Sequence, residues 1–127
     1  AWAWAAGAMV STPSELNTFF QAVFDGRLLS QSSIEEMKKG VDMGSGGRVY
    51  GLGLVGTPLS CGGTSWGHGG TIPGYQTNDA VGPDGTAVTI AVTAMPAAIA
   101  DQSNLESSTK EKDQRLKDAV DATLCHK

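Results

Sequence analysis

The chain has 127 residues, which is enough for one compact domain but few for an enzyme that must also enclose a substrate cleft. Charged residues make up 17% of the sequence and the formal net charge is −4. Neither a basic face for nucleic acid nor a polybasic membrane anchor is therefore expected. We expect residues 1–127 to form a single domain, or part of one.

The ends of the chain carry few targeting signals. Residues 1–10 form an apolar run with two tryptophans that lacks a basic start and is too short to span a bilayer, so we expect a mature or cut N-terminus and no membrane span. Cys61 and Cys125 stand far apart without a CxxC pattern, and there are only two histidines. A zinc site is therefore not expected, whereas the spacing alone leaves a disulfide and free thiols equally open.

Two short helices are predicted before any strand. Thr12-Pro13-Ser14-Glu15 is a capping box with proline at the first helical position. The apolar residues that follow at helical spacing are expected in the core: Leu16, Phe19, Phe20, Val23 and Phe24. A second cap at Ser32–Glu35 predicts a shorter helix that turns Ile34 and Met37 inward and ends at Gly40.

The rest of the chain predicts an antiparallel sheet. Tyr50–Leu54 alternates large residues with glycine, which indicates a strand with one bare face; close approach of another backbone or ligand and a bulged or edge strand are both open. Further strands are expected over residues 65–71, 75–81 and 86–93, with a Gly-Pro-Asp-Gly turn between the last two.

The last predicted strand has one bulky face and one shallow face suited to a helix. Val88, Ile90 and Val92 alternate with smaller residues there. A polar, solvated stretch follows over residues 101–112. Leu116, Val120 and Leu124 then mark an amphipathic helix at the end of the chain. The fold class predicted from these elements is α+β, an antiparallel sheet flanked by helices.

Three motifs occur in a familiar order: Ala6-Gly7-Ala8-Met9-Val10-Ser11-Thr12, Tyr50-Gly51-Leu52-Gly53-Leu54, and Gly67-His68-Gly69-Gly70-Thr71. Their order and spacing resemble the C-terminal half of secreted D-alanyl-D-alanine carboxypeptidases, which are penicillin-binding proteins, and of related class C β-lactamases and esterases. The resemblance implies the C-terminal portion of the β-lactamase/transpeptidase-like fold. It also implies a secreted serine hydrolase that cleaves a small peptide, ester or β-lactam through an acyl-enzyme, without a cofactor.

Members of that family build their site from Ser-x-x-Lys, Tyr-x-Asn or Ser-x-Asn, and Lys-Thr-Gly or His-x-Gly. Only the third element is present, as His68-Gly69-Gly70. The resemblance implies that His68 joins the polar network around the nucleophile and that the Thr71 backbone N–H is an oxyanion donor. Gly69, Gly70 and Thr71 would contact the substrate, with Gly70 leaving room for the acyl group. On residue type alone, a strand histidine bonded to a neighbouring carbonyl is the alternative.

Two departures weaken the carboxypeptidase assignment. Gly69 stands where many such enzymes carry threonine, and Val55 stands where they can place arginine. Both cues for a free C-terminal carboxylate on the substrate are therefore missing. Specificity for an ester, another peptide or an amide without that carboxylate is expected instead.

The resemblance also gives the cysteines a role, because related secreted enzymes bridge a residue seven positions before the motif histidine to one near the chain end. A Cys61–Cys125 disulfide and a secreted or extracytoplasmic location are implied. Ser107 and Lys110 do spell Ser-x-x-Lys, but their charged flanks indicate a solvated linker rather than a desolvated base. Asp79 and Asp84 are interpreted as ordinary strand and turn residues.

Two functional hypotheses follow. In the first, the chain is part of a serine hydrolase whose nucleophile lies on an N-terminal companion segment or chain carrying Ser-x-x-Lys, so that the chain alone is inactive. In the second, it is a non-catalytic binding or structural module that retains the β-lactamase-like scaffold.

Overall fold

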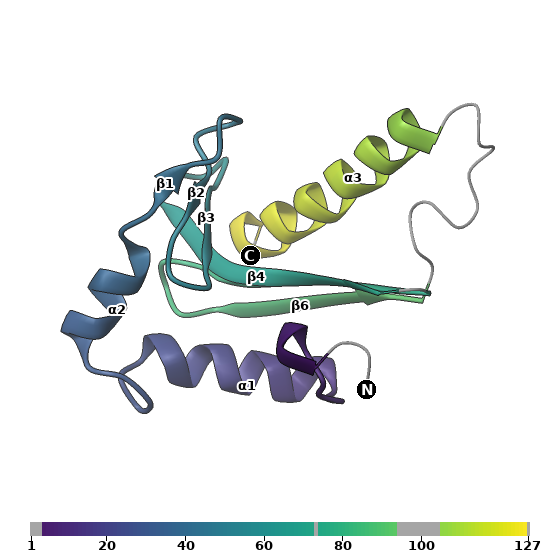
Figure 1. The fold of residues 1–127 in the computed structure, drawn as a ribbon. Helices are drawn as coiled ribbons and strands as arrows, with labels where there is room; N and C mark the ends of the chain where they lie inside the picture. Colours follow the sequence, from purple (N-terminus) through teal and green to yellow (C-terminus); the bar gives the residue numbers. More distant parts are fainter. Residues whose placement is uncertain (1–3, 73, 94–104, 127) are drawn as a thin grey trace.

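The computed structural model describes residues 4–72, 74–93 and 105–126. Six antiparallel strands form one sheet in chain order, and helices cover both of its faces (Figure 1). The elements are a 3-10 helix Trp4–Ala6, helices α1 (Pro13–Phe24), α2 (Gln31–Lys38) and α3 (Leu105–Cys125), and strands β1 (Val41–Asp42), β2 (Val49–Tyr50), β3 (Val55–Pro58), β4 (Thr64–Ile72), β5 (Tyr75–Val81) and β6 (Ala87–Val92). This architecture confirms the predicted α+β fold class.

Helix α1 begins with the predicted capping box. The Thr12 hydroxyl accepts a hydrogen bond from the Glu15 N–H, and the Glu15 carboxylate accepts one from the Thr12 N–H at 2.9 Å. The bonds from Thr12, the backbone one first, hold the pKa of Glu15 below its usual value. The prediction that all the apolar residues are core is wrong for Phe19, which is 52% exposed. The side chain of Asn17 accepts a hydrogen bond from the Thr89 hydroxyl, so Asn17 lies on the face of α1 toward the sheet. Phe19, two positions later, lies on another face of the helix.

Helix α2 begins two residues earlier than predicted. Its N-cap is Ser30, whose hydroxyl accepts a hydrogen bond from the Ser33 N–H at 3.2 Å. Ser30 caps the helix in the way predicted for Ser32, so Ser32 lies inside the first turn of the helix. Ile34 is only 2% exposed, as the pattern predicted.

The strand predicted over Tyr50–Leu54 is wrong, because the segment after Tyr50 is the tight connection between β2 and β3. The Gly51 N–H donates to the Leu54 carbonyl at 2.7 Å, and Gly53 has φ of 70°. A Cβ on Gly51 would lie 2.0 Å from the Met37 carbonyl oxygen. The alternation of glycines thus reflects a positive φ and the close approach of another backbone, rather than the pleat of a strand.

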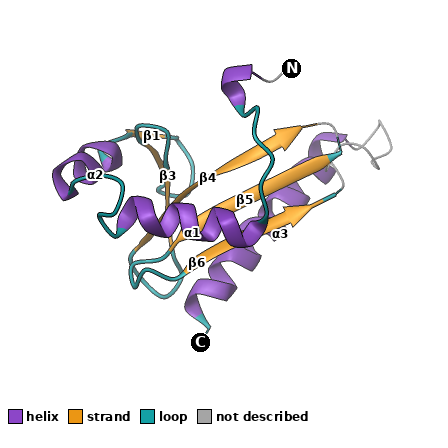
Figure 2. Cartoon of the chain, turned by 90° about the horizontal axis from the view of Figure 1, so that it is seen from below, coloured by secondary structure: helices purple, strands orange, loops and turns teal. Residues whose placement is uncertain are grey.

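The strands predicted over residues 65–71, 75–81 and 86–93 are present as β4, β5 and β6, whereas the short strands β1 and β3 were not predicted. The turn after β5 closes with the Gly85 N–H donating to the Gly82 carbonyl at 3.0 Å. The shallow face of β6 packs against α1, which crosses the strands in Figure 2, and α3 covers the opposite face. The main buried cluster, between α3 and the sheet, comprises Leu59, Ala80, Val88, Val120 and Leu124.

Helix α3 is longer than predicted, because it begins at Leu105 and not after the polar stretch. Polar side chains four positions apart stabilise it by pairing along its surface. The pairs are Glu111 with Arg115 at 2.6 Å, Asp113 with Lys117 at 3.6 Å, and Gln114 with Asp118 at 2.8 Å. The solvated linker is therefore helical from residue 105 onward, while residues 101–104 lie outside the described part.

The end of α3 is fixed to the turn before β4. The Cys61–Cys125 disulfide implied by the family resemblance is present, with 5.6 Å between the Cα atoms. Beside it, Asp121 accepts hydrogen bonds from the Ser60 hydroxyl at 2.6 Å and the Ser60 N–H at 2.8 Å. These bonds lower the pKa of Asp121. Across the described residues, no helix is long and apolar enough to cross a membrane.

Candidate active site

Strand β4 carries the His-Gly-Gly motif and has a partly open edge. Strand β3 pairs with residues 64–67 of β4, whereas β5 pairs with residues 66–72. Within the described part of the chain, residues 68–72 therefore have a neighbouring strand on one side only. An edge of this kind presents backbone N–H and C=O groups to whatever binds beside it.

The glycines of β4 have different reasons to be glycine. A Cβ on Gly67 would lie 1.8 Å from the Asp79 carbonyl oxygen, so the pairing of β4 with β5 requires glycine there. A Cβ on Gly69 would lie 3.0 Å from the Thr77 carbonyl oxygen, and one on Gly70 would lie 3.1 Å from the Thr77 hydroxyl. Side chains at these two positions would crowd β5 and cover the strand surface next to the open edge.

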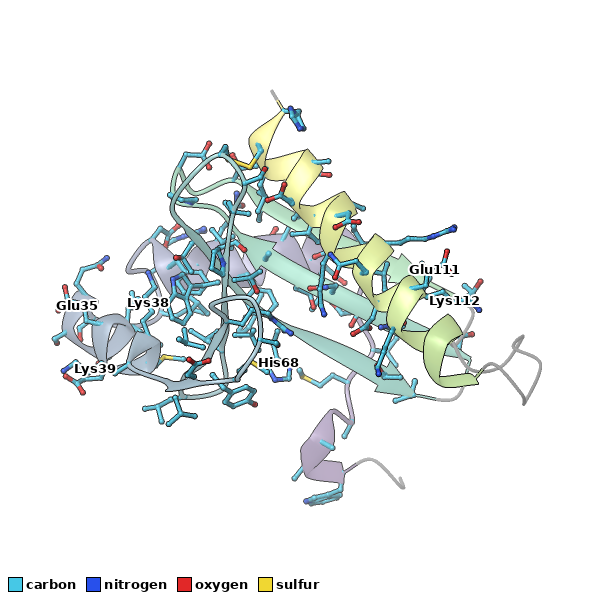
Figure 3. The ribbon with its side chains drawn as sticks, turned by 90° about the horizontal axis from the view of Figure 1, so that it is seen from above. Glu35, Lys38, Lys39, His68, Glu111 and Lys112 are labelled. Carbon is cyan, nitrogen blue, oxygen red and sulfur yellow. A yellow bond between two sulfur atoms is a disulfide. The ribbon has the colours of Figure 1, made fainter. Side chains whose placement is uncertain are left out.

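His68 has a partner for each ring nitrogen. Its Nδ1 lies 2.7 Å from the Gly69 carbonyl oxygen, and its Nε2 lies 3.1 Å from the Tyr50 hydroxyl oxygen. Because a carbonyl only accepts, Nδ1 carries a proton, and in the neutral ring Nε2 accepts the Tyr50 proton. Figure 3 shows His68 at the edge of the sheet beside the first strands. The carbonyl-bonded alternative is thus right for one nitrogen, while the other forms a side-chain pair.

Tyr50 was not among the predicted site residues, although it begins the second of the three motifs. Tyr50 of β2 pairs with Val55, the first residue of β3, and Val55 pairs with Gly67 of β4, so the fold brings Tyr50 next to His68. The rings of Tyr50 and His68 meet edge to face with centroids 5.9 Å apart. The order of the two motifs along the chain can be read from the sequence. Their contact depends on the fold, which places β2, β3 and β4 side by side.

Asp79 is a second residue that sequence analysis missed. It lies opposite His68 on β5 and opposite Thr89 on β6, which places the three side chains in one row on the α1 side of the sheet. The side chain is 7% exposed, and its Oδ1 has no hydrogen-bond partner in the structure. Burial raises the pKa of Asp79, and the Thr89 hydroxyl and His68 act in the opposite direction. A buried carboxyl group therefore adjoins the motif histidine.

A cavity of about 230 Å³ lies beside β4 and extends to α3. Its lining includes Gly69 and Thr71 of β4, Gln76 and Asn78 of β5, Arg48, and the α3 residues Asp113, Lys117 and Asp121. Gln76 is 8% exposed and donates to Asp113 at 2.9 Å, but its Oε1 has no partner in the structure. The Arg48 Nε is likewise buried without a partner. A polar group next to Thr71 would find both a donor and an acceptor here.

The lining of this cavity has no excess of positive charge. Its cations are Arg48 and Lys117, and its carboxyl groups belong to Asp79, Asp113 and Asp121. Such a lining suits a neutral polar group better than an isolated anion. No group of three metal-binding side chains occurs among the residues that the structure describes.

The Ser-x-x-Lys sequence within α3 is not brought to the motif histidine. Ser107 and Lys110 lie in the first turns of α3, which covers the face of the sheet opposite the row of His68, Asp79 and Thr89. Lys110 is exposed. The structure thus places this sequence in a polar surface helix on the far side of the sheet.

Taken together, the antiparallel sheet, the flanking helices and the motif strand at a partly open edge are those of a serine β-lactamase-like fold. The sequence model of the beta-lactamase family matches residues 1–119. The chain belongs to this family.

Solved structures of amide-cleaving enzymes share the arrangement. A D-stereospecific amidohydrolase from Streptomyces sp. is 38% identical over 64% of this chain, with a TM-score of 0.59. A D-amino acid amidase from Ochrobactrum anthropi SV3 in complex with L-phenylalanine amide is 30% identical over 94% of this chain, with a TM-score of 0.62. The same amidase with D-phenylalanine is 28% identical over 90%, with a TM-score of 0.60. This chain spans 25%, 35% and 38% of those three chains, respectively.

Proposed function

We propose that residues 1–127 form the sheet side of the active site in a secreted serine hydrolase that cleaves an amide through an acyl-enzyme. The nucleophilic serine and its lysine belong to a Ser-x-x-Lys motif on a companion segment outside these residues. One observation carries the proposal: the part of β4 that bears His68 and Thr71 has an open edge in a chain of the beta-lactamase family.

The proposed role of β4 is to stabilise the charge that develops during acyl transfer. Attack of the serine on the amide carbon places negative charge on the carbonyl oxygen, and a fixed backbone donor stabilises that charge without reorganising. We assign this donor to the Thr71 N–H, at the open edge. Gly69 and Gly70 leave room for the acyl group to lie against the strand. The proposed lysine takes the serine proton during attack and passes it to the leaving nitrogen as the intermediate collapses and expels the amine, and water then hydrolyses the acyl-enzyme.

His68 is proposed to order the polar groups around the nucleophile. Its ring is held between the Gly69 carbonyl and Tyr50, so the Nε2 atom has a defined direction and tautomer. The buried Asp79 lies opposite it on β5. Burial raises the pKa of Asp79, and His68 acts against this by favouring the carboxylate.

The proposed substrate is an amide without a free C-terminal carboxylate, of the D-amino acid amide class. Gly69 and Val55 replace the two side chains that would bind that carboxylate, and the cavity beside Thr71 has more carboxyl groups than cations. The similar structures named above are a D-stereospecific amidohydrolase and a D-amino acid amidase, which supports the same class. The disulfide is compatible with an extracytoplasmic location and supports secretion.

The test compares three substrates with the natural protein that contains this chain. We expect D-phenylalanine amide to be hydrolysed with a higher kcat/KM than its L enantiomer and than a peptide ending in D-alanyl-D-alanine. Replacing His68 with glutamine should lower kcat, whereas Thr71→Ala should retain most of it because the backbone N–H remains. Faster cleavage of the carboxylate-bearing peptide would contradict the proposed substrate class. Absence of all hydrolysis would favour the non-catalytic module.

A further inference from the structure

We propose that the protein has a second binding site, distinct from the His68 site, for an organic carboxylate with an apolar body. The site is a cavity of about 640 Å³ between the C-terminal ends of α1 and α2 and the turn that joins β5 to β6. This volume lies in the range of pockets for small organic molecules. None of its lining residues lines the cavity beside Thr71, so the proposal is independent of the proposed hydrolase function.

The charged group of the site is the ammonium of Lys38, the last residue of α2. Its Nζ lies 5.1 Å from the centroid of the Phe24 ring and 5.7 Å from that of the Trp66 ring. Both distances allow a cation–π interaction, which orients the ammonium against two ring faces but supplies no hydrogen-bond acceptor. An ammonium has three N–H donors, so donors remain for a bound anion.

Two acidic side chains near Lys38 are already paired with other cations. Glu36 forms an ion pair with Lys39, and Asp25 pairs with Arg27 at 2.7 Å. Among the described residues, no carboxylate lies within ion-pair distance of Lys38. Figure 3 shows Lys38 on the side of α2 toward the sheet, while Glu35 and Lys39 lie toward the outside. Lys38 is therefore a half-buried cation without an anionic partner.

The remaining walls define the rest of the ligand. The charges of Arg27 and Asp25 at the rim cancel each other. Lys38 therefore gives the cavity a net positive charge, although the chain has a formal net charge of −4. Apolar surface comes from Phe24, Trp66, Val81 and Pro83. A carboxylate would pair with Lys38 while an apolar body fills the space between the aromatic rings and the turn.

The experiment titrates the protein with 3-phenylpropanoate and with its neutral analogue 3-phenylpropanamide. The indole N–H signal of Trp66 is followed by NMR, with the signals of Trp2 and Trp4 as internal references. We expect a saturable shift of the Trp66 signal with the carboxylate at concentrations of about 1 mM to 20 mM, and a much smaller one with the amide. An equal response to both compounds, or no saturable response, would overturn the proposal.

Two lysine variants provide the matched comparison. Lys38→Met removes the charge while keeping a side chain of similar length, and we expect it to weaken carboxylate binding about tenfold or more. Lys39→Met, at the neighbouring exposed lysine, should leave binding unchanged. Thermal unfolding of both variants shows whether they fold. Undiminished binding by folded Lys38→Met would overturn the proposal, and the titrations of the unsubstituted protein decide it if that variant does not fold.

Discussion

Replacing Tyr50 with phenylalanine tests the contact that positions His68. The substitution removes only the hydroxyl that lies 3.1 Å from Nε2 and keeps the ring that meets the imidazole edge to face. A neutral hydrogen bond of this kind contributes about 0.5–1.5 kcal/mol, which corresponds to a loss of about 2- to 12-fold in a rate that depends on the ring orientation. The global stability should change little, because Tyr50 is 41% exposed.

The assay combines kinetics with the state of the imidazole. Ring ¹⁵N chemical shifts report the tautomer and the hydrogen bonding of each nitrogen. We expect the wild type to show the Nδ1-protonated form, and Tyr50→Phe to keep this tautomer with a displaced Nε2 signal, because Nε2 loses its hydrogen-bond donor. Tyr75→Phe is the matched control, because Tyr75 is the other tyrosine, lies 57% exposed on β5, and has no hydrogen-bonded hydroxyl in the structure. Unchanged imidazole shifts in Tyr50→Phe would refute the positioning role, even if activity fell.

Three further predictions concern stability. Gly67→Ala should lower the free energy of unfolding by about 3 kcal/mol, because its Cβ would meet the Asp79 carbonyl oxygen, whereas Gly7→Ala, with open space around it, should not lower it. Urea unfolding of both variants measures this difference. Equal free energies of unfolding for the two variants would contradict the prediction. Replacing both Cys61 and Cys125 with alanine opens a loop with a sequence separation of 64 and should cost about 4 kcal/mol in the chain-entropy account, a value that reduction of the wild type should reproduce. Burial raises the folded-state pKa of Asp79 above 3.8, so the contribution of Asp79 to stability is greatest below that pH and decreases as the pH rises through the raised value. The stability of Asp79→Asn should therefore compare more favourably with that of the wild type at about pH 7 than at about pH 4. An equal difference at both pH values would argue against a raised pKa.

The elements that could be predicted from the sequence are those determined by residues close together in the chain. The capping box of α1 and the Gly-Pro-Asp-Gly turn are determined by side chains a few residues apart, and both are present. The disulfide followed from the family resemblance, since spacing alone had left it open. The alternating pattern of β6 also distinguished its two faces correctly.

The errors come from long-range contacts or from competing local solutions. The glycines after Tyr50 resembled the bare face of a strand, but Gly51 is required by the Met37 carbonyl, which only the fold brings close, and Gly53 has a positive φ. Helix α3 begins within a polar stretch that has no apolar periodicity, and charge pairs four residues apart stabilise its turns from Glu111 onward. The Tyr50–His68 pair and the buried Asp79 likewise depend on which residues face each other across strands.

The central claim is that this chain contributes the strand, and another segment contributes the nucleophile, of one serine hydrolase site. The most direct measurement is to label the natural protein with a fluorophosphonate or a fluorescent penicillin and to map the modified serine by mass spectrometry. We predict a single labelled serine in a Ser-x-x-Lys sequence outside residues 1–127, with labelling reduced by His68→Gln. Labelling of Ser107, or of any other serine within this chain, would contradict the claim.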